Sequence, residues 1–137
     1  MKLTRISDQS RYTLHEEFET NDCAGEGKQI AFAAMRRLLE ELGAVDGPSL
    51  FVYTSLFRVC FVAGDDFRLP TITRCTPYYH TLESGEHVVA FQIAFPHATD
   101  LGRSDENWTK WTANKIDDAV QMVLASIQQS VFRPDGD

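Results

Sequence analysis

The sequence predicts an α+β domain in which two helices, the C-terminal one long, cover a mainly antiparallel sheet of about five strands. Three observations predict this fold: an apolar stripe with helical spacing in residues 28–42, a second such stripe near the C-terminus, and β-branched and aromatic residues between them. The predicted order is β-β-α-β-β-β-α. Residues 1–137 form a single predicted domain, because neither half holds enough apolar surface to fold alone.

The composition is that of an ordinary folded protein. Of the 137 residues 43% are hydrophobic and 24% are charged, and 13 Lys and Arg stand against 20 Asp and Glu, for a net charge of −7. The acidic balance disfavours a protein that coats nucleic acid or an anionic membrane. No apolar run approaches the ~20 residues of a membrane span, and the first 20 residues lack the apolar stretch of a secretory signal. Three cysteines without a CxxC motif favour free thiols, hence a cytoplasmic location.

The N-terminal region contains two strand-like pieces. Residues 2–6 alternate, and in residues 11–18 Tyr12, Leu14 and Phe18 lie on a period near two. The DQS between the two pieces favours a turn, and residues 21–27 are expected to form a loop with two glycines.

The first helix is predicted at residues 28–42. Ile30, Ala34, Leu38 and Leu42 repeat every four residues. The opposite side carries i,i+4 pairs of opposite charge, Arg36 with Glu40 and Arg37 with Glu41. Gly43 is expected to provide a left-handed C-terminal cap.

The middle third predicts strands. Residues 49–63 read as one strand, or as two split near Ser55. The GDD at 64–66 favours a turn, and residues 67–79 resume strand character, with Pro70 and Pro77 indicating an edge or bulged strand. After the turn ESGE at 83–86, residues 87–95 are apolar on nearly both faces, which predicts a central strand covered on both sides.

The second helix is predicted to start after an N-cap at Ser104 or Asp105 and to end before Pro134. At this length it would span roughly 37 Å. Its apolar stripe is expected to consist of Trp108, Trp111, Ile116, Ala119, Val120, Val123, Leu124, Ile127 and Val131. The two tryptophans are interpreted as packing at the end of the sheet, with an exposed binding anchor as the alternative.

No catalytic residue, metal ligand or cofactor is predicted. There is no GxSxG, GEGKQ at 25–29 lacks the spacing of a phosphate-binding loop, and no His or Cys group has metal-ligand spacing. Cys60 lies in an apolar run, and Cys75, which follows Arg74, is the better candidate for a reactive thiol. Asp65 and Asp66 are interpreted as turn residues.

A mildly basic stretch is the strongest indication of a binding face. Residues 51–82 carry three arginines and two acids. Arg68 and Arg74 would share one strand face, with Arg58 one hairpin away, and arginines beside tyrosines suit a carboxylate, a phosphate or an acidic protein surface. A solvated face with arginines paired elsewhere is the alternative. The predicted binding residues are Arg58, Arg68, Arg74, Tyr78, Tyr79, His80 and Trp108.

The N-terminal segment offers a face of opposite sign. Between Arg11 and Lys28 there are five acids and no base. A basic partner would be attracted to this segment. The acidic residues are Glu16, Glu17, Glu19, Asp22 and Glu26.

The passage from the first helix through GPSLFVYTSLFRVCFV resembles the helix–Gly-Pro–strand–strand passage of GyrI-like effector-binding domains. The resemblance covers this passage alone. That family has further strands after its second helix, so no residue role is carried over.

The leading functional hypothesis is a small, acidic, non-enzymatic protein of the inhibitor, immunity or chaperone type. It would bind a partner protein through its sheet face or its acidic segment. The first alternative is a sensor of a small anionic ligand, with a pocket between the sheet and the C-terminal helix lined by Arg58, Arg74, Tyr79 and Trp108. The second is an enzyme that uses Cys75 or His80. Nucleic-acid binding is disfavoured, membrane association is not expected, and a homodimer is left open.

Overall fold

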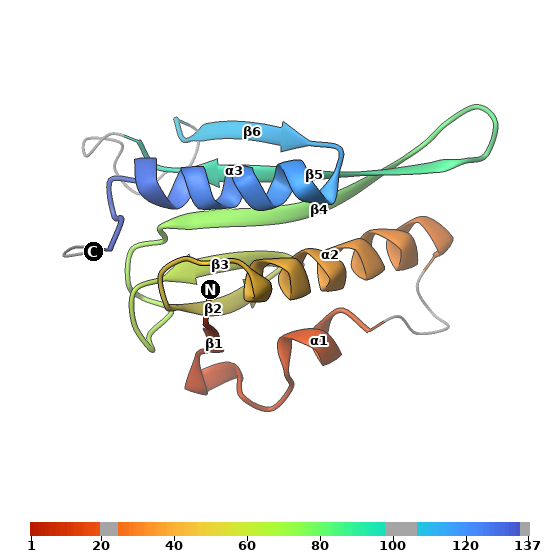
Figure 1. The fold of residues 1–137 in the computed structure, drawn as a ribbon. Coiled ribbons are helices and arrows are strands. Elements are labelled where there is room, and N and C mark those ends of the chain that lie inside the picture. The colour runs from red at the N-terminus through yellow and green to blue at the C-terminus, as the bar shows by residue number, and fades with distance from the viewer. Residues whose placement is uncertain (20–24, 98–106, 135–137) are drawn as a thin grey trace.

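The computed structural model describes residues 1–19, 25–97 and 107–134. A six-stranded sheet has its strands in chain order, and the helices α2 (Glu26–Ala44) and α3 (Ile116–Gln129) pack on one of its faces (Figure 1). Only β1 and β2 are parallel, so the expected α+β class with a mainly antiparallel sheet is confirmed. The strands are β1 (Leu3–Arg5), β2 (Leu50–Ser55), β3 (Arg58–Val62), β4 (Thr73–Thr81), β5 (His87–Phe95) and β6 (Thr109–Ala113).

The second N-terminal strand is replaced by helical turns. Ser7–Gln9 form a 3₁₀ turn, and α1 (Leu14–Glu17) occupies most of the segment predicted as a strand. The Thr13 hydroxyl accepts from the Glu16 N–H at 3.1 Å, and the Glu16 carboxylate accepts from the Thr13 N–H at 3.0 Å. This capping box stabilises the start of a helix, so the strand prediction for residues 11–18 is wrong and the one for 2–6 is right.

The first long helix is longer than expected. It begins at Glu26 and continues to Ala44, so Gly43 lies inside it and is not a left-handed cap. Its core side is formed by Phe32, Met35, Leu38 and Leu42, all buried against the sheet.

The β2–β3 hairpin turns through two residues with positive φ. Leu56 has φ 51° and Phe57 has φ 69°, and this left-handed conformation is costly for side chains larger than Asn. The Phe57 ring lies 5.0 Å from the Phe32 ring and 4.1 Å from the Lys28 ammonium, so Phe57 fastens the turn to α2. Leu56 is 79% exposed.

The chain between β3 and β4 is a loop, not a strand. Asp65 accepts hydrogen bonds from the N–H and the hydroxyl of Ser7, and Asp66 accepts from the guanidinium of Arg68 at 3.0 Å. These contacts belong to a segment, residues 63–72, that lies outside the strands, so Pro70 is not in a strand. The predicted strand therefore resumes only at Thr73.

β4 and β5 continue beyond their outer neighbours as a two-stranded arm. The pairing of β3 with β4 reaches Cys75, and that of β6 with β5 reaches Phe91. Residues 76–81 of β4 therefore have no partner in β3, and residues 87–90 of β5 have none in β6 (Figure 1). In an antiparallel pair, the backbone N–H groups along one strand point alternately toward and away from the partner strand. The Leu82 N–H donates to the Glu86 carbonyl, so at Pro77, five residues earlier, a backbone N–H would point away from β5. Pro77 is thus at an edge, as predicted.

The C-terminal part differs from the prediction in where its helix starts. Trp111 lies in β6, in register with Ile93, and α3 starts at Ile116 and has 14 residues. Trp108 precedes β6, so neither tryptophan belongs to the helix. The proposed caps Ser104 and Asp105 lie outside the described residues.

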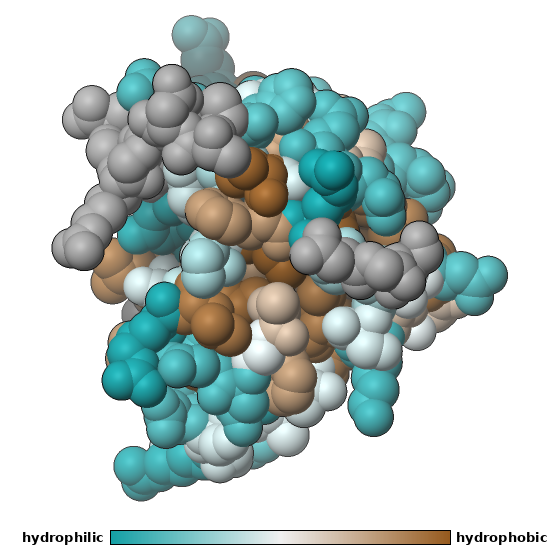
Figure 2. Space-filling view, turned by 90° about the vertical axis from the view of Figure 1, so that its left-hand side faces the viewer, coloured by the Kyte–Doolittle hydropathy of each residue, from teal (hydrophilic) through white to brown (hydrophobic). Residues whose placement is uncertain are grey.

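The core lies between the sheet and the two long helices. On the α3 side it contains Val120, Val123 and Ile127, which pack with Phe91 and Ile93. At one end of the sheet, residues of the loop 63–72 and of the segment 131–134 line a cleft of about 340 Å³. Figure 2 views this end of the molecule and shows apolar side chains gathered in its middle. β5 is buried on both faces only in its second half, because Val88 is exposed and Ala94 is not.

Candidate functional site

The sheet has one face with no described helix packed on it, which we call the open face (Figure 1). The register aligns Tyr53, Cys60, Arg74, Ala94 and Lys110 in one row across β2 to β6 on this face. Residues two positions away along each strand share the face. The open face therefore also carries Arg58, Thr76, Tyr78, His80, Val88, Gln92 and Thr112.

The strands carry no negative side chain. None of the 20 acidic residues of the chain lies in any of the six strands of the described parts. The open face holds Arg58, Arg74 and Lys110 together with His80, so its strand residues make it electropositive in a protein of net charge −7.

Arg74 and Trp108 are in direct contact on the open face. The guanidinium carbon of Arg74 lies 5.1 Å from the centre of the Trp108 ring system, within the range of a cation–π interaction. Trp108 is the residue just before β6, and Arg74 lies in β4, in the middle of the sheet. The structure thus brings together two residues that the sequence assigned to different elements.

Cys60 lies beside Arg58 and Arg74 on the open face and is buried. Burial raises the pKa of its thiol, and hydrogen bonding to Tyr53 and the charges of Arg74 and Arg58 oppose this only in part. Burial also raises the pKa of Tyr53, whose hydroxyl lies 3.3 Å from that of Thr71. A protonated, 4% exposed thiol does not act as a nucleophile, which agrees with the interpretation of Cys60 as a small hydrophobe.

The arm separates the two predicted tyrosines. Tyr78 and His80 are exposed on the open face, whereas Tyr79 lies on the helix side. There Tyr79 covers Gly27, where a Cβ atom would collide with its ring, and it contacts His87 edge-on at 6.0 Å. Tyr79 therefore contributes to the packing of α2 on the arm and not to the open face.

Arg68 does not join the arginine group. It lies in the loop 63–72, where its guanidinium is paired with Asp66. The predicted shared strand face of Arg68 and Arg74 is wrong because Arg68 precedes β4.

Part of the acidic segment is engaged in internal contacts. Glu16 closes the capping box of α1, and the Glu17 carboxylate lies 3.4 Å from the Arg5 guanidinium and accepts from the Thr54 hydroxyl at 3.1 Å. Glu26 lies 3.7 Å from His87. Glu19 is exposed, and Asp22 lies outside the described residues. Glu16, Glu17 and Glu26 are therefore each in contact with another residue of the chain.

Cys75 is not a reactive thiol. It is 1% exposed on the helix side of the sheet, and burial strongly raises its pKa. His80 lies on the opposite face and cannot act as its base, so the structure corrects the expectation that Cys75 is the better nucleophile. His80 and His87 also lie on opposite faces, and the described residues contain no cluster of three potential metal ligands.

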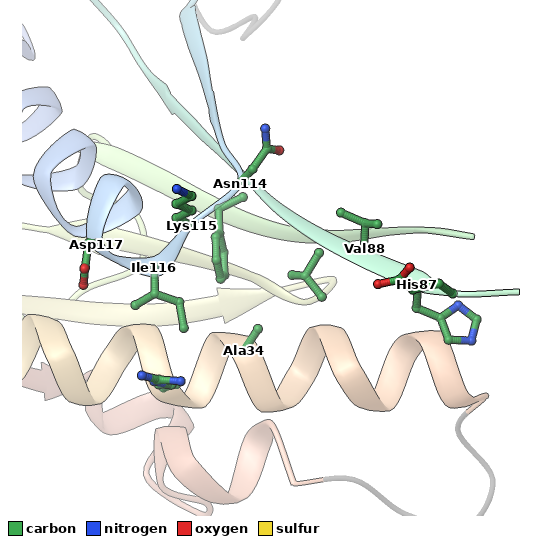
Figure 3. A pocket seen from close by; sticks show the side chains of 11 residues that line it. Ala34, His87, Val88, Asn114, Lys115, Ile116 and Asp117 are labelled. Carbon is green, nitrogen blue, oxygen red and sulfur yellow. The ribbon is translucent and has the colours of Figure 1, made fainter. Parts of the chain in front are cut away.

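A cleft of about 510 Å³ lies between α2, the arm and the residues that lead into α3 (Figure 3). The small-ligand hypothesis placed a pocket between the sheet and the C-terminal helix and lined it with Arg58, Arg74, Tyr79 and Trp108. None of these four residues lines the cleft. The residues that line it are Ala34, Arg37, Glu86, His87, Val88, Val89, Phe91, Asn114, Lys115, Ile116 and Asp117.

Two further observations bear on function. Among the described residues no helix has both the length and the apolar character needed to cross a bilayer. No protein-family model, no curated protein and no solved structure matches this chain, so the resemblance of one passage to GyrI-like domains receives no support and the geometry alone bears on function.

Proposed function

We propose that this protein is a non-enzymatic interaction module that binds an acidic surface of a partner protein through its open face. The observation that carries the proposal is the segregation of charge in the sheet. The open face presents Arg58, Arg74, Lys110 and His80 beside Tyr78 and Trp108, and none of the strands in the described ranges contributes a carboxylate.

The residue types on the open face fit a protein partner. Arg, Tyr and Trp are enriched in the centres of protein interfaces, and Asp and Glu are depleted there. Tyr78 is 48% exposed, and Val88 adds apolar surface beside His80. Complementary charge would set the orientation of the partner and speed its association.

A nucleic acid fits less well. Binding a phosphate backbone depends on many cations, whereas this face has three permanent ones within a chain of net charge −7. Single strands also need aromatic rings free to stack with bases, and the Trp108 ring is already in contact with Arg74.

A reducing compartment such as the cytoplasm suits the two described thiols. Cys60 and Cys75 are both free and both buried, so neither is available to an oxidising partner.

Site-specific photocrosslinking in the source cells tests the proposal. A benzophenone side chain at Thr112, on the open face, is expected to capture one acidic protein, whereas the same group at Gln121, exposed on α3, is not. The captured protein, purified, is then titrated with the wild-type chain and with Arg58→Glu and Lys110→Glu variants. Each reversal is expected to weaken binding at least about tenfold, and the effect to shrink in high salt.

An Arg36→Glu variant provides the matched control, because Arg36 lies on α2, away from the open face, and its reversal is expected to leave binding unchanged. Crosslinks to nucleic acid, crosslinks only from position 121, or equal binding by all variants would each overturn the proposal. Capture of a second copy of the chain would replace it with a homodimer.

A further inference from the structure

The cleft between α2, the arm and α3 carries an inference separate from the open face, with which it shares only Val88. We propose that this cleft binds a small zwitterion, an amino acid with an apolar side chain. The proposal rests on unpaired charges of both signs around one apolar hollow.

Four charged side chains from three parts of the fold line the cleft. Arg37 comes from α2, Glu86 from the arm, and Lys115 and Asp117 from the start of α3. Within the described parts of the chain, none of these four side chains makes an ion pair or a hydrogen bond.

The balance of these charges selects the class of ligand. A simple anion near Arg37 and Lys115 would also meet the carboxylates of Glu86 and Asp117, and a simple cation would meet the two bases. A molecule with one carboxylate and one ammonium group pairs with both sets, through charge-assisted hydrogen bonds. A zwitterion is therefore the small ligand that the cleft repels least.

The floor of the cleft suits an apolar side chain. Ala34, Val89 and Ile116 are half-buried, and Phe91 is buried beneath them. Figure 3 shows the Ile116 side chain directed toward α2, with Lys115 and Asp117 at one end of the cleft, His87 at the other, and the Asn114 side chain directed away from α2. The volume of about 510 Å³ lies in the usual range for small-molecule sites.

His87 closes one end of the cleft without being free to bind. Its Nδ1 lies 2.9 Å from the Thr81 hydroxyl, and its Nε2 lies 3.7 Å from the Glu26 carboxylate. The imidazole is thus held by a residue of the arm and a residue of α2. The charged groups of a ligand would therefore be bound by Arg37, Glu86, Lys115 and Asp117.

Calorimetric titration and thermal unfolding with leucine, valine and phenylalanine test the inference. Two analogues of leucine separate its groups: 4-methylpentanoate lacks the amine, and 3-methylbutylamine lacks the carboxylate. At least one amino acid is expected to bind and to raise the melting temperature, and the analogues are expected to bind at least about tenfold more weakly.

The chain offers neighbouring positions as controls. Arg37→Gln and Asp117→Asn are expected to weaken binding about tenfold or more, as for the loss of one charge-assisted hydrogen bond. Arg36→Gln and Asp118→Asn change the adjacent residues, which do not line the cleft, and are expected to have no effect. All four positions lie on helix surfaces, and circular dichroism checks that each variant folds.

Three results would overturn the inference. The first is that none of the three amino acids binds. The second is that 4-methylpentanoate binds as well as leucine, which would indicate a simple anion site. The third is that Arg36→Gln weakens binding as much as Arg37→Gln does.

Discussion

The hydroxyl oxygens of Thr73 in β4 and Ser126 in α3 lie 2.8 Å apart, and neither residue is exposed. Ser126 donates to the Val123 carbonyl at 2.7 Å, which leaves its oxygen to accept from Thr73. Thr73 also lies 3.3 Å from the Ala94 carbonyl. This polar link favours one register of α3 on the sheet, because a shifted helix would lose the contact between the two hydroxyls and keep only the bonds to the Val123 and Ala94 carbonyls.

Removal of either hydroxyl is expected to destabilise the fold. Ser126→Ala deprives Thr73 of its short acceptor, and Thr73→Val removes the donor, so each should lower the free energy of unfolding by about 1 kcal/mol. The double variant should lose less than the sum of the two, because the residues share one bond. Urea unfolding measures all four proteins, and strictly additive losses would contradict the link.

Leu56→Asn is expected to stabilise the protein. Leucine at φ 51° carries a steric cost of roughly 1–2 kcal/mol, and asparagine tolerates this region much better. Leu56 is 79% exposed and loses little packing, so a gain of about 1 kcal/mol should be visible as a higher urea midpoint. Phe57→Asn has the same backbone benefit but loses the contact with Phe32, and it should not gain stability. An unchanged or lower midpoint for Leu56→Asn would show that the turn is not strained.

The two described cysteines are expected to resist alkylation. In a Cys23→Ser background, iodoacetamide should label Cys60 and Cys75 rapidly in urea and only slowly in the native protein, because burial keeps both thiols protonated. Mass spectrometry at timed intervals measures both rates. Rapid native labelling of Cys75 would restore the thiol-enzyme hypothesis.

Stability is expected to fall in alkaline solution. The pKa of the Cys75 thiol is raised above the ordinary value of 9.0, so above that pH the unfolded chain has lost a proton that the folded chain retains. The free energy of unfolding should be constant with respect to this group below pH 9 and should decrease as the pH rises further. In Cys75→Ala, urea unfolding between pH 7 and 10.5 should show a smaller decrease. Parallel curves for the two proteins would contradict the assignment.

The sequence contained the information for α1, but its apolar spacing pointed elsewhere. Tyr12, Leu14 and Phe18 suggested a strand, yet Thr13 and Glu16 have the spacing of a capping box. Phe18 is fully buried as the C-terminal cap of that short helix. In a segment this short, local hydrogen bonds outweigh the pattern of three apolar residues.

The tryptophans illustrate a limit of a different kind. Trp108 and Trp111 are three residues apart, a spacing that fits a helix. Pairing of β6 with β5, and above all Trp111 with Ile93, determines the observed strand. Such long-range pairing cannot be derived from the periodicity of a five-residue segment.

Parts of the two candidate sites differ in how far they could be predicted. Strand alternation is enough to place Arg74, Tyr78 and His80 on one face, and the structure has them there, with Arg58 added by the pairing of β3 with β4. The same alternation places Tyr79 on the opposite face from Tyr78, because neighbouring residues in a strand point to opposite sides. Grouping the two tyrosines in one predicted binding face overlooked this. The lining of the cleft depends on how α2 and α3 approach the arm, and no sequence pattern encodes that packing.

Pro77 has a consequence for how the protein meets other molecules. A bare two-stranded ribbon would ordinarily invite an additional strand along its flank, and so invite fibre-like growth from one molecule to the next. At Pro77 the outward-facing position has a ring instead of a donor. The β4 flank of the ribbon is therefore protected against unwanted recruitment of strands, while its open face, with Tyr78 and His80, stays accessible for recognition.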